Sequence, residues 1–182
     1  MSEYDLKTPK GFFKKYLIDF EGIDLDWVNG SKPKWTSKNL DYFARLGKDY
    51  HYKVHAKCQG CEPEYLVDLC WIGEEYNIVL ALEQEWARDL QGLEKDFSKL
   101  TNVKAYLKVF ICHPSRNIPN FPDLIAKHIS NIIIKNLEES YLLITFSRNH
   151  RTKRIQVDGW SINYRGDTIE FLGQSFFPDS LT

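Results

Sequence analysis

The feature that most constrains the fold is a pair of apolar segments, Tyr65–Ile72 and Ile78–Trp86, joined by Gly73–Asn77. Nearly every position in both segments is apolar, which is typical of central strands that are covered on both faces. The connection is short and contains glycine, so the two segments can pair as an antiparallel hairpin. We therefore predict a sheet with this hairpin buried near its centre.

Helical and strand patterns surround the hairpin. Apolar residues at helical spacing predict helices at residues 11–21, from a cap at Thr36 or Ser37 to Gly47, at residues 90–100 and from Pro122 onward. Further strands are predicted at Tyr52–Ala56, Ala105–His113, Tyr141–Ser147, Arg154–Tyr164 and Thr168–Phe171, with turns at Asp158-Gly159 and Gly166-Asp167. The expected fold class is α/β, with a central mixed sheet flanked by helices and a β-rich C-terminal extension over residues 141–173.

Composition limits the classes of protein to consider. A chain of 182 residues can bury one substantial core, so we predict a single α/β domain over residues 1–182. No apolar run is long enough to span a bilayer, and Met1–Pro9 lacks a secretion signal, so we expect a cytoplasmic protein without a membrane partner. Its four cysteines form no dense framework, so disulfides are unnecessary and a reducing compartment is the simpler interpretation. A formal net charge of −1 means that nucleic-acid binding would need a local basic patch.

Three acidic residues in the hairpin carry the main functional signal. A turn centred between Glu75 and Tyr76 places Asp68 directly opposite Glu83, and Glu85 shares that face because side chains alternate along a strand. Like charges that face each other across two strands destabilise the pair unless a cation balances them. Magnesium accepts one or two protein carboxylates together with waters and phosphate oxygens. Asp68, Glu83 and Glu85 are therefore predicted ligands of Mg²⁺ or Mn²⁺.

A second interpretation of these acids stays open. A register shifted by one residue would send Asp68 and Glu83 to opposite faces of the sheet. Acids in strands also commonly lie at sheet ends with ordinary lysine or arginine partners. The predicted metal site therefore depends on the register of the hairpin.

The hairpin and its flanks resemble the PD-(D/E)XK nuclease superfamily, which has the restriction-endonuclease-like fold. The resemblance rests on Asp68, on Glu83-Gln84-Glu85, and on the order of predicted elements over residues 36–113. It implies an αβββαβ core and Mg²⁺-dependent hydrolysis of phosphodiester bonds in DNA. The chain departs from the family pattern in two ways. No proline precedes Asp68, and Glu85 stands where the family usually has lysine, although some restriction endonucleases of this fold carry glutamate there.

The resemblance also implies roles for individual residues. Asp68 and Glu83 would bind the metal, with the carbonyl of Gln84 as a further oxygen, and Glu85 would be another ligand or the base that acts on water. Lys99, in the following helix, is a candidate substitute for the missing lysine. The alternative for Lys99 is an ordinary solvated helix lysine.

Because the restriction-endonuclease-like fold often adds an acid from an N-terminal helix, Glu21 and Asp41 are both candidates for that position.

Two other functions remain open. The missing lysine and the near-neutral charge favour a catalytically inert nuclease-fold module for interaction or assembly, and a homodimer is also left open. The spacing of Cys58-Gln59-Gly60-Cys61 is that of half a zinc knuckle, which Cys112-His113 could complete. The alternative is a turn ending in a cysteine, with Cys70 and Cys112 packed in the core.

Basic and aromatic residues could supply contacts to DNA. One loop is expected to hold Arg148, His150, Arg151, Lys153 and Arg154, and a second basic group consists of Lys32, Lys34 and Lys38 with Trp27 and Trp35 nearby. Such residues can neutralise a phosphate backbone and stack on unpaired bases, although a solvated loop is the simpler interpretation of either group alone. His51 and His55 are predicted on one face of the first strand, from which they could reach a phosphate.

Overall fold

A computed structural model describes residues 4–23, 31–56, 58, 60–62, 66–133, 137–149, 151–152 and 154–178. Within these residues the chain forms four α-helices, seven strands and one short 3₁₀ turn. In chain order they are α1 (Pro9–Ile23), α2 (Lys32–Asp49), β1 (Lys53–Ala56), β2 (Leu69–Ile72), the 3₁₀ turn η1 (Glu74–Tyr76), β3 (Ile78–Glu85), α3 (Leu90–Thr101), β4 (Leu107–Cys112), α4 (Phe121–Ser130), β5 (Ser140–Asn149), β6 (Arg154–Asn163) and β7 (Ile169–Pro178).

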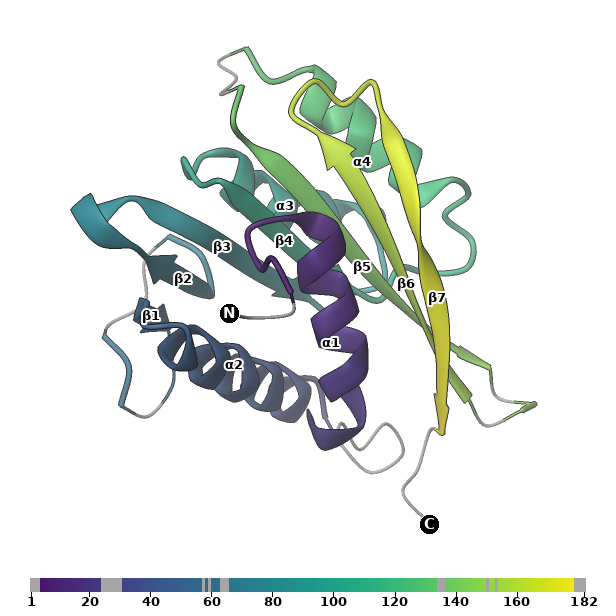
Figure 1. Ribbon diagram of the computed structural model, residues 1–182. Coiled ribbons are helices and arrows are strands. Elements are labelled where there is room, and N and C mark those ends of the chain that lie inside the picture. Colours follow the sequence, from purple (N-terminus) through teal and green to yellow (C-terminus); the bar gives the residue numbers. More distant parts are fainter. Residues whose placement is uncertain are drawn as a thin grey trace.

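The described strands all join one mixed sheet whose order follows the chain from β1 to β7. Neighbouring strands are antiparallel from β1 to β3, parallel from β3 to β5, and antiparallel again from β5 to β7. The colours in Figure 1 therefore change steadily across the sheet. The predicted α/β class is confirmed, and the C-terminal strands extend the same sheet.

Helices cover both faces of the sheet (Figure 1). The face under α1 and α2 packs around side chains such as Trp71 and Leu80, whereas the face under α3 and α4 packs around Cys70 and Ala81. All four residues of β2 are buried because both of its faces are covered. None of the described helices combines the length and the apolar character needed to cross a membrane.

The hairpin of β2 and β3 has the predicted register, although its turn differs from the prediction. Leu69 pairs with Leu82, which is the register that the prediction of Asp68 opposite Glu83 requires. Next to the turn the register shifts, and Ile72 pairs with Ile78. Val79 is the extra residue of a bulge that restores the predicted register beyond the turn.

Three predicted boundaries are wrong for identifiable reasons. Helix α2 begins at Lys32 rather than after Thr36, because Ser31 is its N-cap residue and a proline occupies its first turn. Strand β2 begins only at Leu69, so Leu66–Asp68 precede the strand. The residues Asp158-Gly159 lie inside β6 and form no turn.

Gly159 instead allows α1 to approach the sheet, since a Cβ atom there would lie 2.6 Å from the ring of Phe13. The predicted turn at Gly166 is confirmed, with a φ of +72° that favours glycine. The two glycines thus serve different purposes. Gly159 leaves room for the ring of Phe13, and Gly166 adopts a left-handed backbone conformation.

Candidate metal and phosphate site

The ends of β2 and β3 hold Asp68 and Glu83 together. The backbone N–H of Asp68 donates a hydrogen bond to Oε1 of Glu83 at 3.0 Å. The backbone N–H of Gln84 donates to Oδ2 of Asp68 at 2.9 Å. Each carboxyl group therefore accepts a hydrogen bond from the other strand. These contacts bring together the two acids that the sequence pattern predicts opposite each other, with Asp68 just before β2.

Glu83 lies in an environment that disfavours its negative charge. Its side chain is only 2% exposed, and Oε2 accepts a hydrogen bond from Nζ of Lys99 at 3.2 Å. Burial, together with the negative charge of Asp68, raises the pKa of Glu83 to about 8, although the Lys99 ammonium opposes this rise. Burial therefore favours the protonated form of Glu83, and its closest cation is the Lys99 ammonium.

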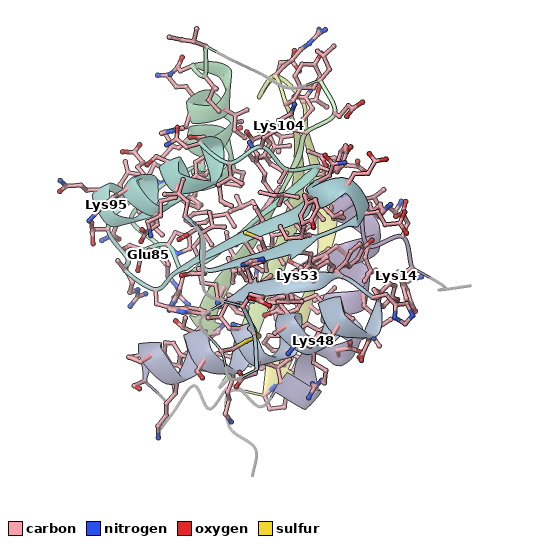
Figure 2. All side chains as sticks on the ribbon, turned by 90° about the vertical axis from the view of Figure 1, so that its left-hand side faces the viewer. Lys14, Lys48, Lys53, Glu85, Lys95 and Lys104 are labelled. Carbon is pink, nitrogen blue, oxygen red and sulfur yellow. A yellow bond between two sulfur atoms is a disulfide. The ribbon has the colours of Figure 1, made fainter. Side chains whose placement is uncertain are left out.

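Glu85 faces the same helix but has different partners. Its carboxyl group accepts a hydrogen bond from the backbone N–H of Ala87. Burial and a hydrogen bond to Asp96 raise the pKa of Glu85. Burial opposes ionisation of Asp96, but hydrogen bonds from Glu85 and Lys99 hold the pKa of Asp96 below its ordinary value. Figure 2 shows Glu85 next to α3, the helix that carries Asp96 and the labelled Lys95.

Lys99 bridges two acids and does not extend into solvent as an ordinary helix lysine would. Its Nζ atom lies 2.5 Å from Oδ1 of Asp96 and 3.2 Å from Oε2 of Glu83. Although burial opposes it, these carboxylates hold the pKa of Lys99 above its ordinary value. The sequence pattern did not single out Asp96 as a candidate acid. The signal for it was its spacing of three residues from Lys99, which places both on one side of a helix.

The structure brings two of the three predicted metal ligands, Asp68 and Glu83, into contact. Among the described residues, no group of three or more His, Cys, Asp or Glu side chains is arranged to hold a metal ion. Glu85 is engaged by Ala87 and Asp96, which leaves Asp68 and Glu83 as the close pair. Magnesium commonly uses one or two protein carboxylates. Burial is the first cause of the raised pKa of Glu83 and the charge of Asp68 is the second, and a cation at this pair would favour the ionised form of Glu83.

Three arginines lie in the segments at the C-terminal ends of the parallel strands. Glu85 of β3 pairs with Cys112 of β4, so the loops that follow these strands begin side by side. The backbone N–H of Ser115 donates to the carbonyl of Arg88 at 3.0 Å, and the guanidinium of Arg116 donates to the carbonyl of Arg148. Three arginines from separate loops and strands are thus brought to the edge that carries the acids.

The other predicted basic and aromatic residues are more scattered. Trp35 packs edge-on against Trp86, with ring centroids 5.5 Å apart, so its ring belongs to the core. Lys34 and Lys38 lie on α2, and Arg151 and Arg154 are exposed around the turn between β5 and β6. Outside the described residues lie Trp27, His150, Lys153 and the side chains of Lys32 and Glu21. Asp41, the other candidate N-terminal acid, is exposed on α2.

The prediction that His51 and His55 share one face of a strand is wrong. His51 lies in the turn before β1 and has a φ of +63°, whereas His55 is within the strand. The strand is shorter than predicted because the chain is still turning out of α2 at that point. The two histidines therefore do not act as a pair on one strand surface.

The cysteines also differ from the prediction. Cys58 and Cys61 form a disulfide with their Cα atoms 5.6 Å apart, a separation that a three-residue turn readily provides. Cys70 and Cys112 are free and buried under α3 and α4, as expected for core residues. The zinc site completed by Cys112-His113 is wrong, because Cys112 lies in the core beneath α3 and α4 whereas the disulfide packs against the core beneath α1 and α2.

Comparison of the sequence with protein-family models and with curated proteins finds no match to either. The assignment of a function therefore depends on the geometry described above.

Proposed function

We propose that this protein is a Mg²⁺-dependent nuclease with a restriction-endonuclease-like core that hydrolyses phosphodiester bonds in DNA. The observation that carries the proposal is the pair formed by Asp68 and Glu83, with the Lys99 ammonium 3.2 Å from Glu83. The order α2, β1, β2, β3, α3, β4, in which β4 runs parallel to β3, agrees with the αβββαβ order that the resemblance implies.

Each residue of the site has a distinct role in this proposal. Asp68 and Glu83 would hold the cation, which would supply Lewis-acid chemistry at a phosphoryl oxygen. Glu85, whose pKa is raised by burial and by Asp96, would accept the proton of the attacking water when it is in its ionised form. Lys99 supplies the positive charge that the motif lysine would have given. Asp96 is a positioning residue that holds Lys99 beside Glu83.

The charge distribution is compatible with a polyanionic substrate. The chain has a net charge of −1, so affinity for DNA must come from a local group of cations. Arg88 follows β3, Arg116 follows β4 and Arg148 lies near the end of β5, so all three belong to the C-terminal end of the parallel strands. Contacts from these arginines to phosphates would orient the backbone without selecting a base sequence.

Substitution of Asp68 tests the proposal. We expect the wild-type protein to bind Mn²⁺ in calorimetry and to cleave plasmid or single-stranded DNA only when Mg²⁺ or Mn²⁺ is present. Asp68→Asn keeps the size of the side chain but removes its charge, so Mn²⁺ binding should be lost and the cleavage rate should fall by about 100-fold or more. Calorimetry and a gel-based cleavage assay measure the two effects.

Glu94→Gln is the matched control, because Glu94 is an exposed acid on α3 that lies outside the site. This variant should bind Mn²⁺ and cleave DNA as the wild type does. The proposal fails if the purified wild type binds neither Mg²⁺ nor Mn²⁺, or if Asp68→Asn cleaves DNA at the wild-type rate.

A catalytically inert module of the same fold is the second candidate. The observation in its favour is that protein groups already partner the acids, since Lys99 pairs with Glu83 and Glu85 is bound to Ala87 and Asp96. An inert module would bind no divalent cation. In that case Asp68→Asn would change only the thermal stability of the protein.

A further inference from the structure

The Cys58–Cys61 disulfide lies outside the carboxylate site and has its own chemistry. Cys58 and Cys61 are both partly exposed, although they also pack against the core beneath α1 and α2. All four cysteines of the chain are described, and the other two, Cys70 and Cys112, are buried as free thiols. An external thiol can therefore act on one bond, and the protein has one accessible redox couple.

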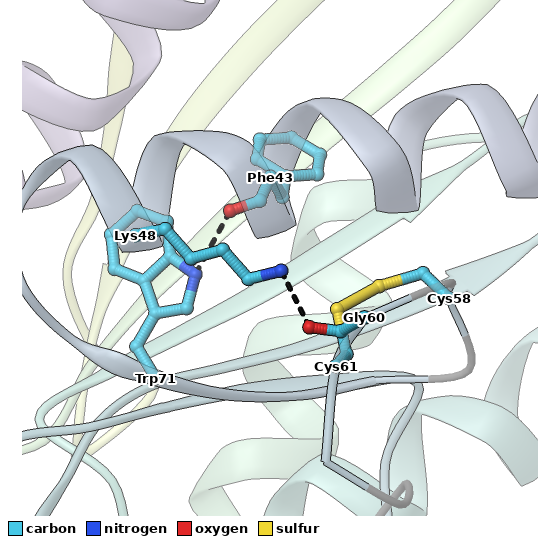
Figure 3. The surroundings of a disulfide bond; sticks show 6 residues. All are labelled: Phe43, Lys48, Cys58, Gly60, Cys61 and Trp71. Atoms are coloured by element: carbon cyan, nitrogen blue, oxygen red, sulfur yellow. Dashed lines mark hydrogen bonds between the residues drawn. A yellow bond between two sulfur atoms is a disulfide. The ribbon is translucent and has the colours of Figure 1, made fainter.

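Lys48 places a positive charge over the disulfide turn. Its Nζ atom donates to the carbonyl oxygen of Gly60, between the two cysteines, at 2.8 Å. Figure 3 shows this ammonium reaching the turn from α2. Gly60 has a φ of +72°, a left-handed conformation that glycine adopts without a Cβ penalty. A neighbouring cation favours the thiolate form of cysteine, so Lys48 assists the sulfur that leaves when the bond breaks.

The disulfide turn brings the chain back to the outer edge of β1. The backbone N–H of Ala56 donates to the carbonyl of Glu62, and the N–H of Glu62 donates to the carbonyl of Val54, both at 3.1 Å. The carboxylate of Glu62 also lies 3.8 Å from Nζ of Lys53. β1 is the first strand of the sheet, so its outer edge would otherwise expose unpaired backbone groups. The hydrogen bonds to Glu62 pair some of these groups.

A single strand separates the turn from the carboxylate pair. Ala56, which bonds to Glu62, is paired on its other side with Leu69 of β2. Leu69 directly follows Asp68, whose N–H donates to Glu83. A loss of conformational order in the disulfide turn can therefore affect Asp68 through the paired backbones of β1 and β2.

We propose that Cys58–Cys61 is a redox site that reacts with a dithiol reductant and thereby regulates the carboxylate pair. The regulatory part rests on the proposed function. One thiolate of the reductant attacks one sulfur, which forms a mixed disulfide and releases the other cysteine as a thiolate. The second thiol of the reductant then displaces the first cysteine. The protein gains two electrons and two protons, and the reductant becomes a disulfide.

The oxidised turn keeps Glu62 bound to the edge of β1 and so keeps Asp68 against Glu83. In the reduced protein the covalent constraint is absent, and the hydrogen bonds of the edge open more often. The oxidised form is therefore the form with the higher affinity for the cation.

Redox titration in buffers of reduced and oxidised dithiothreitol, followed by alkylation and mass spectrometry, tests the first part. Under native conditions Cys58 and Cys61 should become alkylated together and reversibly, whereas Cys70 and Cys112 should stay unmodified. The redox site is refuted if the bond resists excess dithiothreitol in the folded protein, or if the buried cysteines react at the same rate.

Amide hydrogen exchange tests the connection to the site without relying on a metal. Reduction should accelerate exchange at Ala56, Glu62 and Asp68 by about tenfold, while Val109 in the centre of the sheet should be unchanged. Equal exchange in the two redox states overturns the connection. The comparison uses the wild-type chain, so it holds even if a cysteine variant fails to fold.

Calorimetry with Mn²⁺ tests regulation itself. Reduction should weaken Mn²⁺ binding by about tenfold, in line with the loss of order at Asp68. The double variant Cys58→Ser/Cys61→Ser should bind as the reduced protein does and should not respond to dithiothreitol, which controls for chelation of the metal by the reductant. Equal affinity in both states overturns regulation. If neither state binds Mn²⁺, the proposed function fails, and exchange at Asp68 alone decides whether the turn is coupled to this position.

Discussion

Two ionisable residues are buried in the sheet with partners of different kinds. Lys108 is 1% exposed, and its Nζ atom lies 2.8 Å from Oε2 of Glu139 and 3.3 Å from the hydroxyl of Tyr141. Asp158 is 9% exposed and accepts hydrogen bonds from the side-chain amide of Gln156 at 2.9 and 2.8 Å. The lysine thus has a partner of opposite charge, whereas the amide that binds Asp158 is neutral.

Asp158 should make the stability of the protein depend on pH. Burial raises the pKa of Asp158 despite the opposing hydrogen bond from Gln156, so the folded state binds this proton more tightly than the unfolded state does. The contribution is therefore fully present at low pH and is lost as the pH rises through the folded pKa. We expect Asp158→Asn to raise Tm at pH 7.5 by roughly 2–4 °C, the effect of about 1 kcal/mol in a chain of this size. At pH 3 the two proteins should melt together, and a larger gain at pH 3 than at pH 7.5 would contradict this reasoning.

Gly47 occupies a helix position where glycine allows two elements to meet. It lies within α2, and a Cβ atom there would be 2.4 Å from Nε1 of Trp71. That indole donates to the carbonyl of Phe43 at 3.1 Å, as Figure 3 shows, and stacks on Tyr52 at 5.5 Å. The helix therefore packs directly against β2 at this point.

Gly47→Ala should destabilise the protein. In an exposed helix this change would stabilise by up to about 1 kcal/mol, but here the new methyl group must displace Trp71. We expect a loss of about 1–3 kcal/mol in the free energy of unfolding, measured in urea. Ser37→Ala, at an exposed position of the same helix, should stay within about 0.5 kcal/mol of the wild type. A more stable Gly47→Ala variant would show that the indole is not confined there.

The glycines also show what the sequence can and cannot predict at this scale. Apolar runs predict the central strands, and a turn centred between Glu75 and Tyr76 places Asp68 opposite Glu83. Gly47 was expected to end a helix and Gly159 to form a turn, since glycine is common in both settings. Each is instead required by a ring from another element, namely Trp71 or Phe13. Such a need depends on tertiary contacts, which no local pattern contains.

Side-chain partners in the site were equally beyond local patterns. Alternation predicts which face Glu85 occupies, but not that Asp96 would approach it from α3. Lys99 could be proposed only as a candidate, because its reach to Glu83 depends on how α3 packs on the sheet. The bulge at Val79 was also not predictable, since it compensates for a turn whose conformation becomes fixed only on pairing.

For the molecule as a whole, the disulfide should contribute measurably to stability. A covalent link across a short loop restricts the unfolded chain, and chain entropy gives about 2 kcal/mol for a loop of this length. Reduction with dithiothreitol should therefore lower Tm by roughly 4–8 °C. Calorimetry of the oxidised and reduced proteins measures the difference. The Cys58→Ser/Cys61→Ser variant should show no response to reductant, and an unchanged Tm for the reduced wild type would contradict the expectation.

The sheet order repeats the order of the chain, which has a consequence for biosynthesis. Each strand from β2 to β7 forms its first ladder with the strand translated just before it. Low sequence separation between partners favours rapid pairing, and domains fold while synthesis proceeds at the ribosome. The sheet can therefore grow from β1 towards β7 as the polypeptide emerges. The hairpin that carries the acidic pair can therefore form once β3 has emerged, before the C-terminal strands have been translated.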